Sequence, residues 1–299
     1  MSKLHWLALS TVPGIGGATA RRLIERFGSV EAIFDAPDEE LRQVPRLTAE
    51  VLARLRTVSL EALEGELASL AEEGLGVVTW DDSDYPVNLR QVNDAPPVLF
   101  LRGDLQASDE YAVAIVGTRE PSSEGVDMAE MLGRELAARG LTIVSGLALG
   151  IDTAAHRGAL QAEGGRTLAV PGSGLRAIHP RENVPLAEKI TRRGALLSEL
   201  HPNTPARGPN LMARDRIISG LSHAVIVVEA GEKSGSLDTA AKALHQKRLL
   251  FAVPGSPGTQ ALLAGGAESL GPQAVDLDGL SQRIGAHTFD ACAAQLSLL

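Results

Sequence analysis

The chain has 299 residues, of which 44% are hydrophobic and 22% charged, so a disordered chain is excluded and two or three packed domains are expected. The formal net charge is −9, and aromatic residues are scarce, with two Trp, two Tyr and five Phe. On these totals alone a nucleic-acid partner is disfavoured, because a phosphate-binding protein usually carries an excess of basic residues.

Cysteine usage and hydropathy restrict the setting in which this chain works. The lone cysteine, Cys292, excludes an internal disulfide framework and a cysteine-rich zinc site. The first ten residues hold one lysine and an interrupted apolar run, so they do not read as a signal peptide. No run of eighteen uncharged apolar residues is present, and we expect no membrane contact. The expected location is the reducing cytoplasm, and neither a metal nor a cofactor is expected.

Residues 1–75 show the 3.6-residue periodicity of helices. After a first helix that begins near Leu4, the pattern predicts helices at 18–27, 29–34, 37–43 and 48–70. The string Val12-Pro13-Gly14-Ile15-Gly16 lies between the first two and resembles a helix-hairpin-helix element, whose backbone N–H groups can hold a phosphate. The alternative is a plain helix connector in an interaction domain. The charge of this region favours the alternative, because residues 1–109 contain 10 Lys and Arg against 18 Asp and Glu.

The remainder of the chain has a different organisation. Residues 76–110 are expected to form an extended connector with one short strand at 77–80, because Pro and Gly interrupt the rest. Residues 111–285 alternate apolar strands with helices, which predicts a Rossmann-like, doubly wound, mostly parallel sheet. The expected strands are residues 112–116, 142–144, 167–170, 195–197, 224–228 and 249–253. The expected helices are residues 123–138, 151–162, 184–193, 211–219, 237–245 and 259–264.

Small, polar and glycine-rich residues follow each of the six predicted strands. Because ligands of open parallel sheets bind beyond the carboxyl ends of the strands, these loops are expected to meet at one binding rim. Glycines let backbone N–H groups approach a ligand, helix N-termini supply positive potential, and arginines neutralise anions, so the rim predicts phosphate recognition. Glycines that merely turn the chain would explain one or two such loops, but not six. The candidate contacts are Gly117, Thr118, Arg119, Ser145, Gly146, Gly172, Ser173, Gly174, Arg181, Arg214, Arg216, Lys233, Ser234, Gly235 and Ser236.

The local charge of the chain is compatible with an anion-binding rim. Residues 157–216 contain ten basic residues against five acidic ones, an excess of +5 that the total conceals. The count alone does not decide between an anion-binding surface and solvated helix faces.

Enzyme signatures are missing. The chain has neither a P-loop nor the dinucleotide-binding glycine fingerprint after its first predicted strand. Asp152 and His156 lie four residues apart on one predicted helix and could form an acid–base pair, but a carboxylate bonded locally at the helix N-terminus is favoured. We therefore expect a binding protein and no catalytic residue.

Several strings, in chain order, resemble the DprA/Smf family of DNA-processing proteins. They include Ile115-Val116-Gly117-Thr118-Arg119, Ser145-Gly146-Leu147-Ala148-Leu149-Gly150-Ile151-Asp152, Arg214-Asp215-Arg216-Ile217-Ile218-Ser219-Gly220 and Phe251-Ala252-Val253-Pro254-Gly255. The resemblance covers roughly residues 105–270, and the helical part is similar to the family's sterile-alpha-motif-like, helix-hairpin-helix domain.

The resemblance implies a protein that binds single-stranded DNA, protects incoming DNA, loads the RecA recombinase during natural transformation and acts as a homodimer. It implies that Arg119 is the basic group of the pocket and that His179-Pro180-Arg181-Glu182-Asn183 adds Arg181 and Asn183. With few aromatic residues, the strand is expected to be held through phosphates more than stacked bases, and therefore independently of its sequence.

This chain departs from the family pattern in three places. Asn210-Leu211-Met212 stands where members often read Asn-Phe-Pro, and Asp215 stands where Asn is usual between two arginines. Residues 286–299 are expected to be a tail, because the roughly 25 residues after the sheet are too few for the winged-helix-like domain of many members.

Two other functions stay open at this point. Pro254-Gly255-Ser256-Pro257-Gly258-Thr259 partly echoes the motif of phosphoribohydrolases that cleave nucleoside monophosphates, although the paired glycines and the following Glu are missing. The acidic helical part could instead serve as a scaffold that docks another protein.

Overall fold

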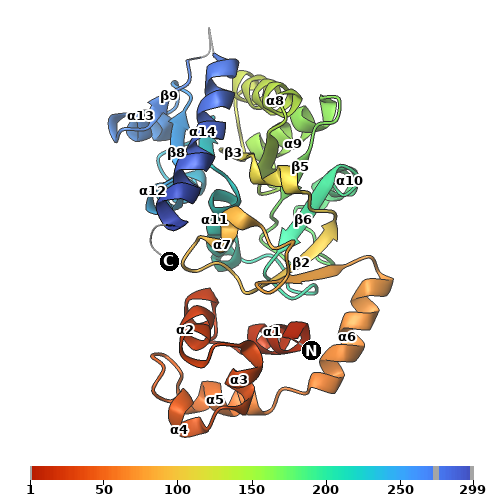
Figure 1. Ribbon diagram of the computed structural model, residues 1–299. Helices are drawn as coiled ribbons and strands as arrows, with labels where there is room; N and C mark the ends of the chain where they lie inside the picture. Colours follow the sequence, from red (N-terminus) through yellow and green to blue (C-terminus); the bar gives the residue numbers. More distant parts are fainter. Residues whose placement is uncertain (1, 272–275, 297–299) are drawn as a thin grey trace.

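Six helices form the first part of the chain, at the bottom of Figure 1. The computed structural model describes residues 2–271 and 276–296, and side chains within 2–271 and 276–286. Polar caps start three of these helices, with Ser29, Thr48 and Ser59 each accepting a backbone N–H three residues on. The helices are α1 Ser2–Thr11, α2 Gly17–Phe27, α3 Val30–Asp35, α4 Asp38–Leu41, α5 Ala49–Arg56 and α6 Leu60–Glu72.

The single helix expected over residues 48–70 is two helices. The chain leaves the helical path at Thr57, whose N–H bonds to Arg54 and Leu55, and a new helix starts after Ser59. The side chain of Ser59 caps α6 by accepting from the Ala62 N–H. A serine that can cap the next helix competes with helix continuation, and periodicity alone does not detect this break.

A nine-stranded sheet forms the second part, in the order β1-β2-β6-β5-β4-β3-β7-β8-β9. All neighbours from β6 to β9 are parallel, and β2 pairs antiparallel with both β1 and β6. The predicted Rossmann-like, doubly wound sheet is confirmed. The strands are β1 Gly76–Thr79, β2 Val98–Gly103, β3 Ala112–Val116, β4 Thr142–Ser145, β5 Thr167–Ala169, β6 Gly194–Ser198, β7 Ala224–Val227, β8 Leu249–Ala252 and β9 Glu268–Ser269.

Residues 76–110 do more than connect the two parts. They supply β1 and β2, and they hold the short helices α7 Val87–Arg90 and η1 Ala107–Glu110. The second strand was not predicted, although its Val98, Leu99 and Phe100 form an apolar run that is buried in the structure. The run pairs with β1, and from Phe100 onward β2 also pairs with β6, which is distant in sequence. Only the assembled sheet therefore shows the full extent of this strand.

Helices cover both faces of the sheet, because all five residues of β3 are buried although their side chains alternate between the two faces. Val113 and Ile115 of β3 face a cluster built by α8, α9 and α14, whereas Ala114 and Val116 face a cluster built by α7, α11 and α12. Figure 1 shows α8 and α9 at the upper right and α11 with α7 nearer the centre. These helices and the remaining ones are α8 Ser123–Ala138, α9 Ile151–Gln161, η2 Arg181–Asn183, α10 Val184–Ile190, α11 Gly208–Leu221, α12 Ser236–His245, α13 Pro257–Ala264 and α14 Leu277–Leu296.

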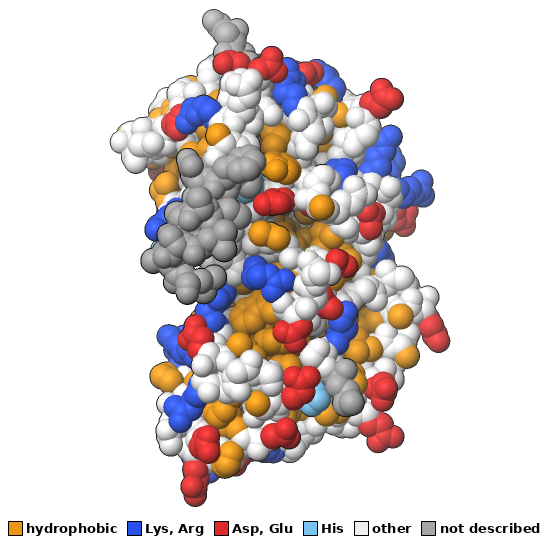
Figure 2. Space-filling model, viewed as in Figure 1, with side chains coloured by type: hydrophobic (Ala, Val, Ile, Leu, Met, Phe, Trp, Pro, Cys, Tyr) orange, Lys and Arg blue, Asp and Glu red, His pale blue; other side chains and the backbone are white. Residues whose placement is uncertain are grey.

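The helical part packs directly on the sheet part. One apolar cluster runs from α1 and α2 to Phe100 of β2 and to Leu186 and Ile190 of α10. Figure 2 shows hydrophobic side chains gathered at the middle of this face, where the two parts meet. Arg176 pairs with Glu73, the residue directly after α6, at 2.6 Å, so charged groups also join the helical part to the loop after β5.

The helix-hairpin-helix turn lies between α1 and α2, as predicted, and its Pro13, Gly14 and Gly16 are exposed. The helix that follows the turn packs against the chain itself. A Cβ on Gly17 would lie 2.1 Å from the carbonyl oxygen of Ala95, so the first turn of α2 is packed against the segment before β2. Arg21, one turn further along, adds hydrogen bonds to the carbonyl oxygens of Arg90 and Val92.

The expected boundary at residue 286 falls inside a helix. The α14 helix runs from Leu277 to Leu296, and Leu280 and Ile284 of its first half are buried against the sheet. Residues 297–299 of the expected tail, and the side chain of Cys292, lie outside what the structure describes. In the described ranges, no helix has the length and hydropathy to cross a membrane.

Candidate nucleic-acid interface

An open cavity of about 670 Å³ lies where the strand order of the sheet reverses. From β3 the chain proceeds outward on one side through β4, β5 and β6, and it returns at β7 on the other side of β3. The loops after β3 and β7 diverge here and leave a crevice, as parallel sheets do at such a point. The lining includes Gly117, Thr118, Arg119, Glu120, Asp152, Leu211, Met212, Arg214, Asp215, Ile218, Lys233, Ser234, Gly235 and Ser236.

The loop after β3 presents Arg119 to this cavity. The Thr118 N–H donates to the Glu229 carbonyl oxygen at 2.7 Å, and the Ile151 N–H donates to that of Thr118 at 3.2 Å, so the loop is held from both sides. Gly117 is required there, because a Cβ would lie 2.5 Å from the Ile151 side chain. Arg119 is exposed, and within 2–271 and 276–286 its side chain has no hydrogen bond or ion pair.

The loop after β7 brings a second cation and two hydroxyl groups to the same cavity. Lys233 is exposed, and the hydroxyls of Ser234 and Ser236 lie 2.8 Å apart. Ser236 is the first residue of α12, one residue before the expected start, so the hydroxyls stand at the positive end of a ten-residue helix. This combination of an exposed cation, hydroxyls and a helix N-terminus suits an anionic ligand.

Arg214 forms part of the cavity floor. Its side chain is 8% exposed, and its guanidinium donates to the carbonyl oxygens of Gly146, at 2.6 Å, and of Val170. Gly146 is required beside it, because a Cβ there would lie 1.9 Å from the Arg214 nitrogen Nη1. Arg214 therefore joins the loops after β4 and β5, and only part of its charge faces the cavity.

Two buried carboxylates lie beside Arg214. Asp152 accepts from the N–H groups of Gly146 at 3.1 Å and Ala148 at 3.3 Å, so it fixes the loop before α9. Asp215 lies 2.9 Å from the Arg214 nitrogen Nε. Burial raises the pKa of both carboxyls, that of Asp215 to about 6, because a charge loses its hydration in the protein interior.

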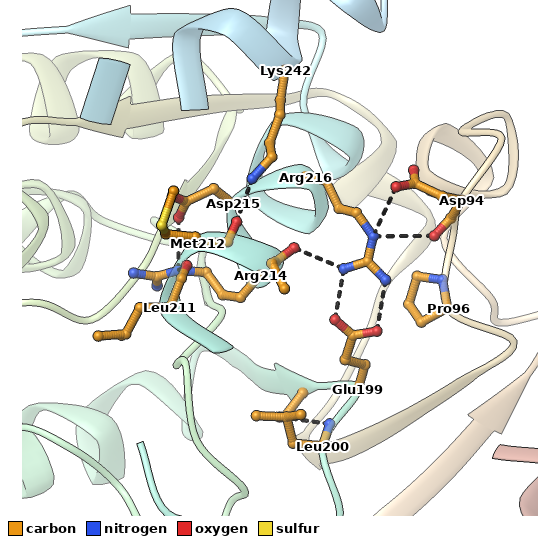
Figure 3. Close-up of polar contacts among 12 residues, drawn as sticks. Asp94, Pro96, Glu199, Leu200, Leu211, Met212, Arg214, Asp215, Arg216 and Lys242 are labelled. Carbon is orange, nitrogen blue, oxygen red and sulfur yellow. Dashed lines mark hydrogen bonds and ion pairs between the residues drawn. The ribbon is translucent and has the colours of Figure 1, made fainter. Parts of the chain in front are cut away.

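Arg216 points away from the cavity, and its expected role in phosphate binding is not what the structure shows. Figure 3 shows its guanidinium directed toward Glu199 and Asp94, with Arg214 leaving α11 in another direction. Both terminal nitrogens donate to Glu199 at 2.6 Å, and Nε lies 3.3 Å from the Asp94 carboxylate. The Arg216 charge is thus neutralised by two carboxylates and is withheld from a ligand.

The first residues of the loop after β4 and the segment after β5 are buried in the protein, which corrects the six-loop binding rim, although Ala148 of the β4 loop still lines the cavity. Ser145 is fully buried and donates to the carbonyl oxygen of Ile115, and the segment from Gly172 through Ser173 to Gly174 is buried as well. A Cβ on Gly174 would lie 2.1 Å from the carbonyl oxygen of His201. These small residues permit close internal packing and leave no room for a ligand.

Arg181 and Asn183 have separate positions. Asn183 is 3% exposed, and its amide group donates to the carbonyl oxygen of Leu147 and the hydroxyl of Thr153, at 2.9 and 2.8 Å. It holds the loop after β4 in place. Arg181 is exposed and is not among the residues that line the cavity.

The suspected pair of Asp152 and His156 is absent. His156 is fully buried with Nδ1 2.7 Å from the Thr167 hydroxyl, and burial lowers its pKa to about 3. Asp152 is bonded locally at the start of α9, as the sequence favoured. The partial phosphoribohydrolase motif is a helix cap, because Ser256 and Thr259 bond reciprocally at the start of α13.

The sequence analysis did not predict three residues of the cavity wall as site residues, and it named them only as departures from the family pattern. Leu211, Met212 and Asp215 line the cavity from α11, and Met212 is 56% exposed. Their helical spacing, at positions i, i+1 and i+4, is the signal that could have placed them on one face with Arg214.

The fold and this cavity define a Rossmann-like protein whose open crevice, with Arg119 and Lys233 exposed in its lining, lies at the switch point of its sheet. Residues 76–277 match the family model of DNA recombination-mediator protein A, and residues 7–57 match that of the SAM-like helix-hairpin-helix tandem. The chain therefore belongs to the DprA/Smf family, as its motifs indicated.

Relatives support this membership over most of the chain. DNA processing protein DprA of Bacillus subtilis is 44% identical over 191 residues, which cover 64% of each chain. Protein Smf of Escherichia coli is 38% identical over 259 residues, covering 85% of this chain and 68% of the relative. The chain thus spans about two thirds of the length of these curated relatives.

Two solved structures are similar as well. The X-ray structure of DNA processing protein A from Streptococcus pneumoniae has a TM-score of 0.77 and 32% identity, covering 89% of this chain and 94% of that one. DNA processing protein A from Helicobacter pylori, studied for its binding of single-stranded DNA, has a TM-score of 0.63 and 30% identity. It covers 70% of this chain, and 97% of its own length is matched.

Proposed function

We propose that this chain binds single-stranded DNA, with the phosphates held at the mouth of the switch-point cavity. Arg119 and Lys233 would neutralise phosphates, and Ser234, Gly235 and Ser236 would offer hydroxyl and backbone N–H donors. The Helicobacter pylori relative, described as binding single-stranded DNA, supports this ligand. A flexible single strand can bring its phosphates into such a crevice, whereas a rigid duplex cannot bend as sharply.

The free guanidinium of Arg119 is the observation that carries the proposal. Arg214 and Arg216 are both committed to protein oxygens, whereas Arg119 faces the cavity without a partner in the part of the chain whose side chains are described. An exposed arginine on a loop fixed by two backbone hydrogen bonds is preorganised for a phosphate.

Binding titrations with Arg119→Ala test the proposal. Fluorescently labelled single- and double-stranded oligonucleotides would be titrated at several salt concentrations. We expect wild type to prefer the single strand, and the variant to lose roughly tenfold in affinity, since it lacks one hydrogen bond to a charged group. The slope of log affinity against log salt should fall by about 0.7, the contribution of one phosphate in a single strand.

Arg157→Ala is the matched control. Arg157 is exposed on α9 and does not line the cavity, so its removal lowers the net charge equally. Equal affinities and equal salt slopes for the two variants would show that Arg119 is no special contact and would refute the site.

We further propose that the family's wider role extends to this chain. It would protect incoming DNA in the cytoplasm during natural transformation, act as a homodimer and load the RecA recombinase on the bound strand, without catalysis of its own. Family membership supports these steps. Light scattering after gel filtration tests the dimer. Strand exchange by RecA on DNA covered by a single-strand-binding protein tests loading, and no acceleration by this chain would contradict it.

A further inference from the structure

The cavity is larger and more apolar than the binding of a phosphate group requires. Its volume of about 670 Å³ extends from Arg119 and Lys233 down to a wall of Leu211, Met212 and Ile218. Met212 is 56% exposed although it is apolar, and it stands at this wall. Flat apolar ligands are what such a wall accommodates, since a methionine sulfur contacts aromatic rings favourably.

Asp215, which also lines the cavity, has few partners. Its side chain is 10% exposed and forms an ion pair with the Arg214 nitrogen Nε at 2.9 Å, and within 2–271 and 276–286 no further N–H or O–H group donates to its carboxylate. A carboxylate can accept about four hydrogen bonds, and buried polar groups are usually satisfied. Because Asp215 lines the cavity, the missing donors can come from a ligand.

We propose that the cavity takes up one unstacked base of the bound strand, against Leu211 and Met212, and that Asp215 selects guanine over thymine there. This inference rests on the proposed binding of single-stranded DNA, and it departs from the expectation of sequence-independent binding by adding one base-specific contact. The phosphates stay at Arg119 and Lys233, and the base enters below them.

The hydrogen-bonding edges of the bases explain this order. Guanine presents two neighbouring donors, N1–H and the exocyclic amine, which match the two oxygens of a carboxylate. Thymine presents one donor between two carbonyl oxygens, and these repel the carboxylate. Adenine and cytosine each present one amine beside a ring nitrogen acceptor, so we expect them to fall between guanine and thymine.

The charge state of Asp215 sets the conditions for a test. Arg214 and Lys242 face it as cations and favour its ionised form, whereas Asp152 and Asp238 oppose it. Burial raises its pKa to about 6, so at about pH 8 the carboxylate is ionised and can only accept hydrogen bonds.

The test compares labelled oligo(dT) strands of about 12 nucleotides, a length within the range that single-strand sites cover. One central dT is replaced by dG, or by deoxyinosine, which keeps N1–H but lacks the amine. At about pH 8 we expect the dG strand to bind roughly 5- to 100-fold more tightly than oligo(dT), as a bidentate base contact does. The inosine strand should lie between them, and this comparison needs no protein variant.

Asp215→Asn should bring the dG and dT strands to within about twofold, because the amide offers one acceptor in place of two. Glu232→Gln removes an equal charge at an exposed position that does not line the cavity, and it should keep the wild-type ratio. The inference is overturned if wild type binds all strands equally, or if Asp215→Asn keeps the preference. A wild-type protein that binds none of the strands would instead refute the proposed function.

Discussion

Replacing Arg216 by Met tests whether this arginine stabilises the fold or binds the ligand. The side chain is 13% exposed and Glu199 is 22% exposed, with two hydrogen bonds of 2.6 Å between them. Removing one member of a buried ion pair costs about 3–5 kcal/mol, because the other charge stays buried without a partner. Since Glu199 keeps some contact with water, we expect a loss of about 3 kcal/mol. Met retains the apolar stem of the arginine, so packing is largely kept.

Urea unfolding followed by fluorescence measures this loss. With a slope of at least about 3 kcal/mol per molar urea for a chain of this size, the midpoint should fall by roughly 1 M. Adding Glu199→Gln to Arg216→Met should recover part of the stability, because an amide is less costly to bury than a carboxylate. Arg54→Ala is the control, since its pair with Glu50 is half to three-quarters exposed and should cost less than about 1 kcal/mol.

Affinity for single-stranded DNA should remain within about twofold of wild type in the folded Arg216→Met protein, because the guanidinium faces Glu199 and Asp94. A variant with wild-type stability and a tenfold weaker affinity would refute the conclusion that Arg216 stabilises the fold and does not contact DNA.

Two further predictions concern buried residues near the cavity. His156 has a pKa of about 3 in the folded protein against about 6.5 when unfolded, so its contribution to stability is complete above pH 6.5 and is lost as the pH falls toward 3. Wild type should therefore lose about 1.4 kcal/mol more per pH unit than His156→Gln between pH 6 and 4, and parallel unfolding curves would contradict this. Gly146→Ala should cost about 1–3 kcal/mol, because the new Cβ would collide with the Arg214 guanidinium. Gly65→Ala, in open space on α6, should instead gain up to about 1 kcal/mol in the same unfolding assay, and equal effects at both sites would contradict the contact.

Local chemistry determined much of the fold. The strand over Ala112–Val116 and the helix over Ser123–Ala138 have the predicted bounds, because a continuous apolar run and an amphipathic run with a serine cap are signals within single segments. The alternation of such segments was enough to predict the doubly wound sheet. The strand at Val98–Gly103, which lies between β1 and β6, was missed, because β6 lies some distance further along the chain.

The candidate site was likewise predicted in part from the sequence and decided in part by the tertiary structure. Sequence placed glycine-rich loops at one edge of the sheet, because parallel strands end together there. Only the tertiary structure showed that the loops after β3 and β7 stay open, while the start of the loop after β4 and the segment after β5 are buried. Arg214 and Arg216 look alike in sequence, yet two residues of helical rotation direct one toward the cavity and the other toward Glu199 and Asp94. Their surroundings come from distant segments, and the chain acquires these contacts only when it folds.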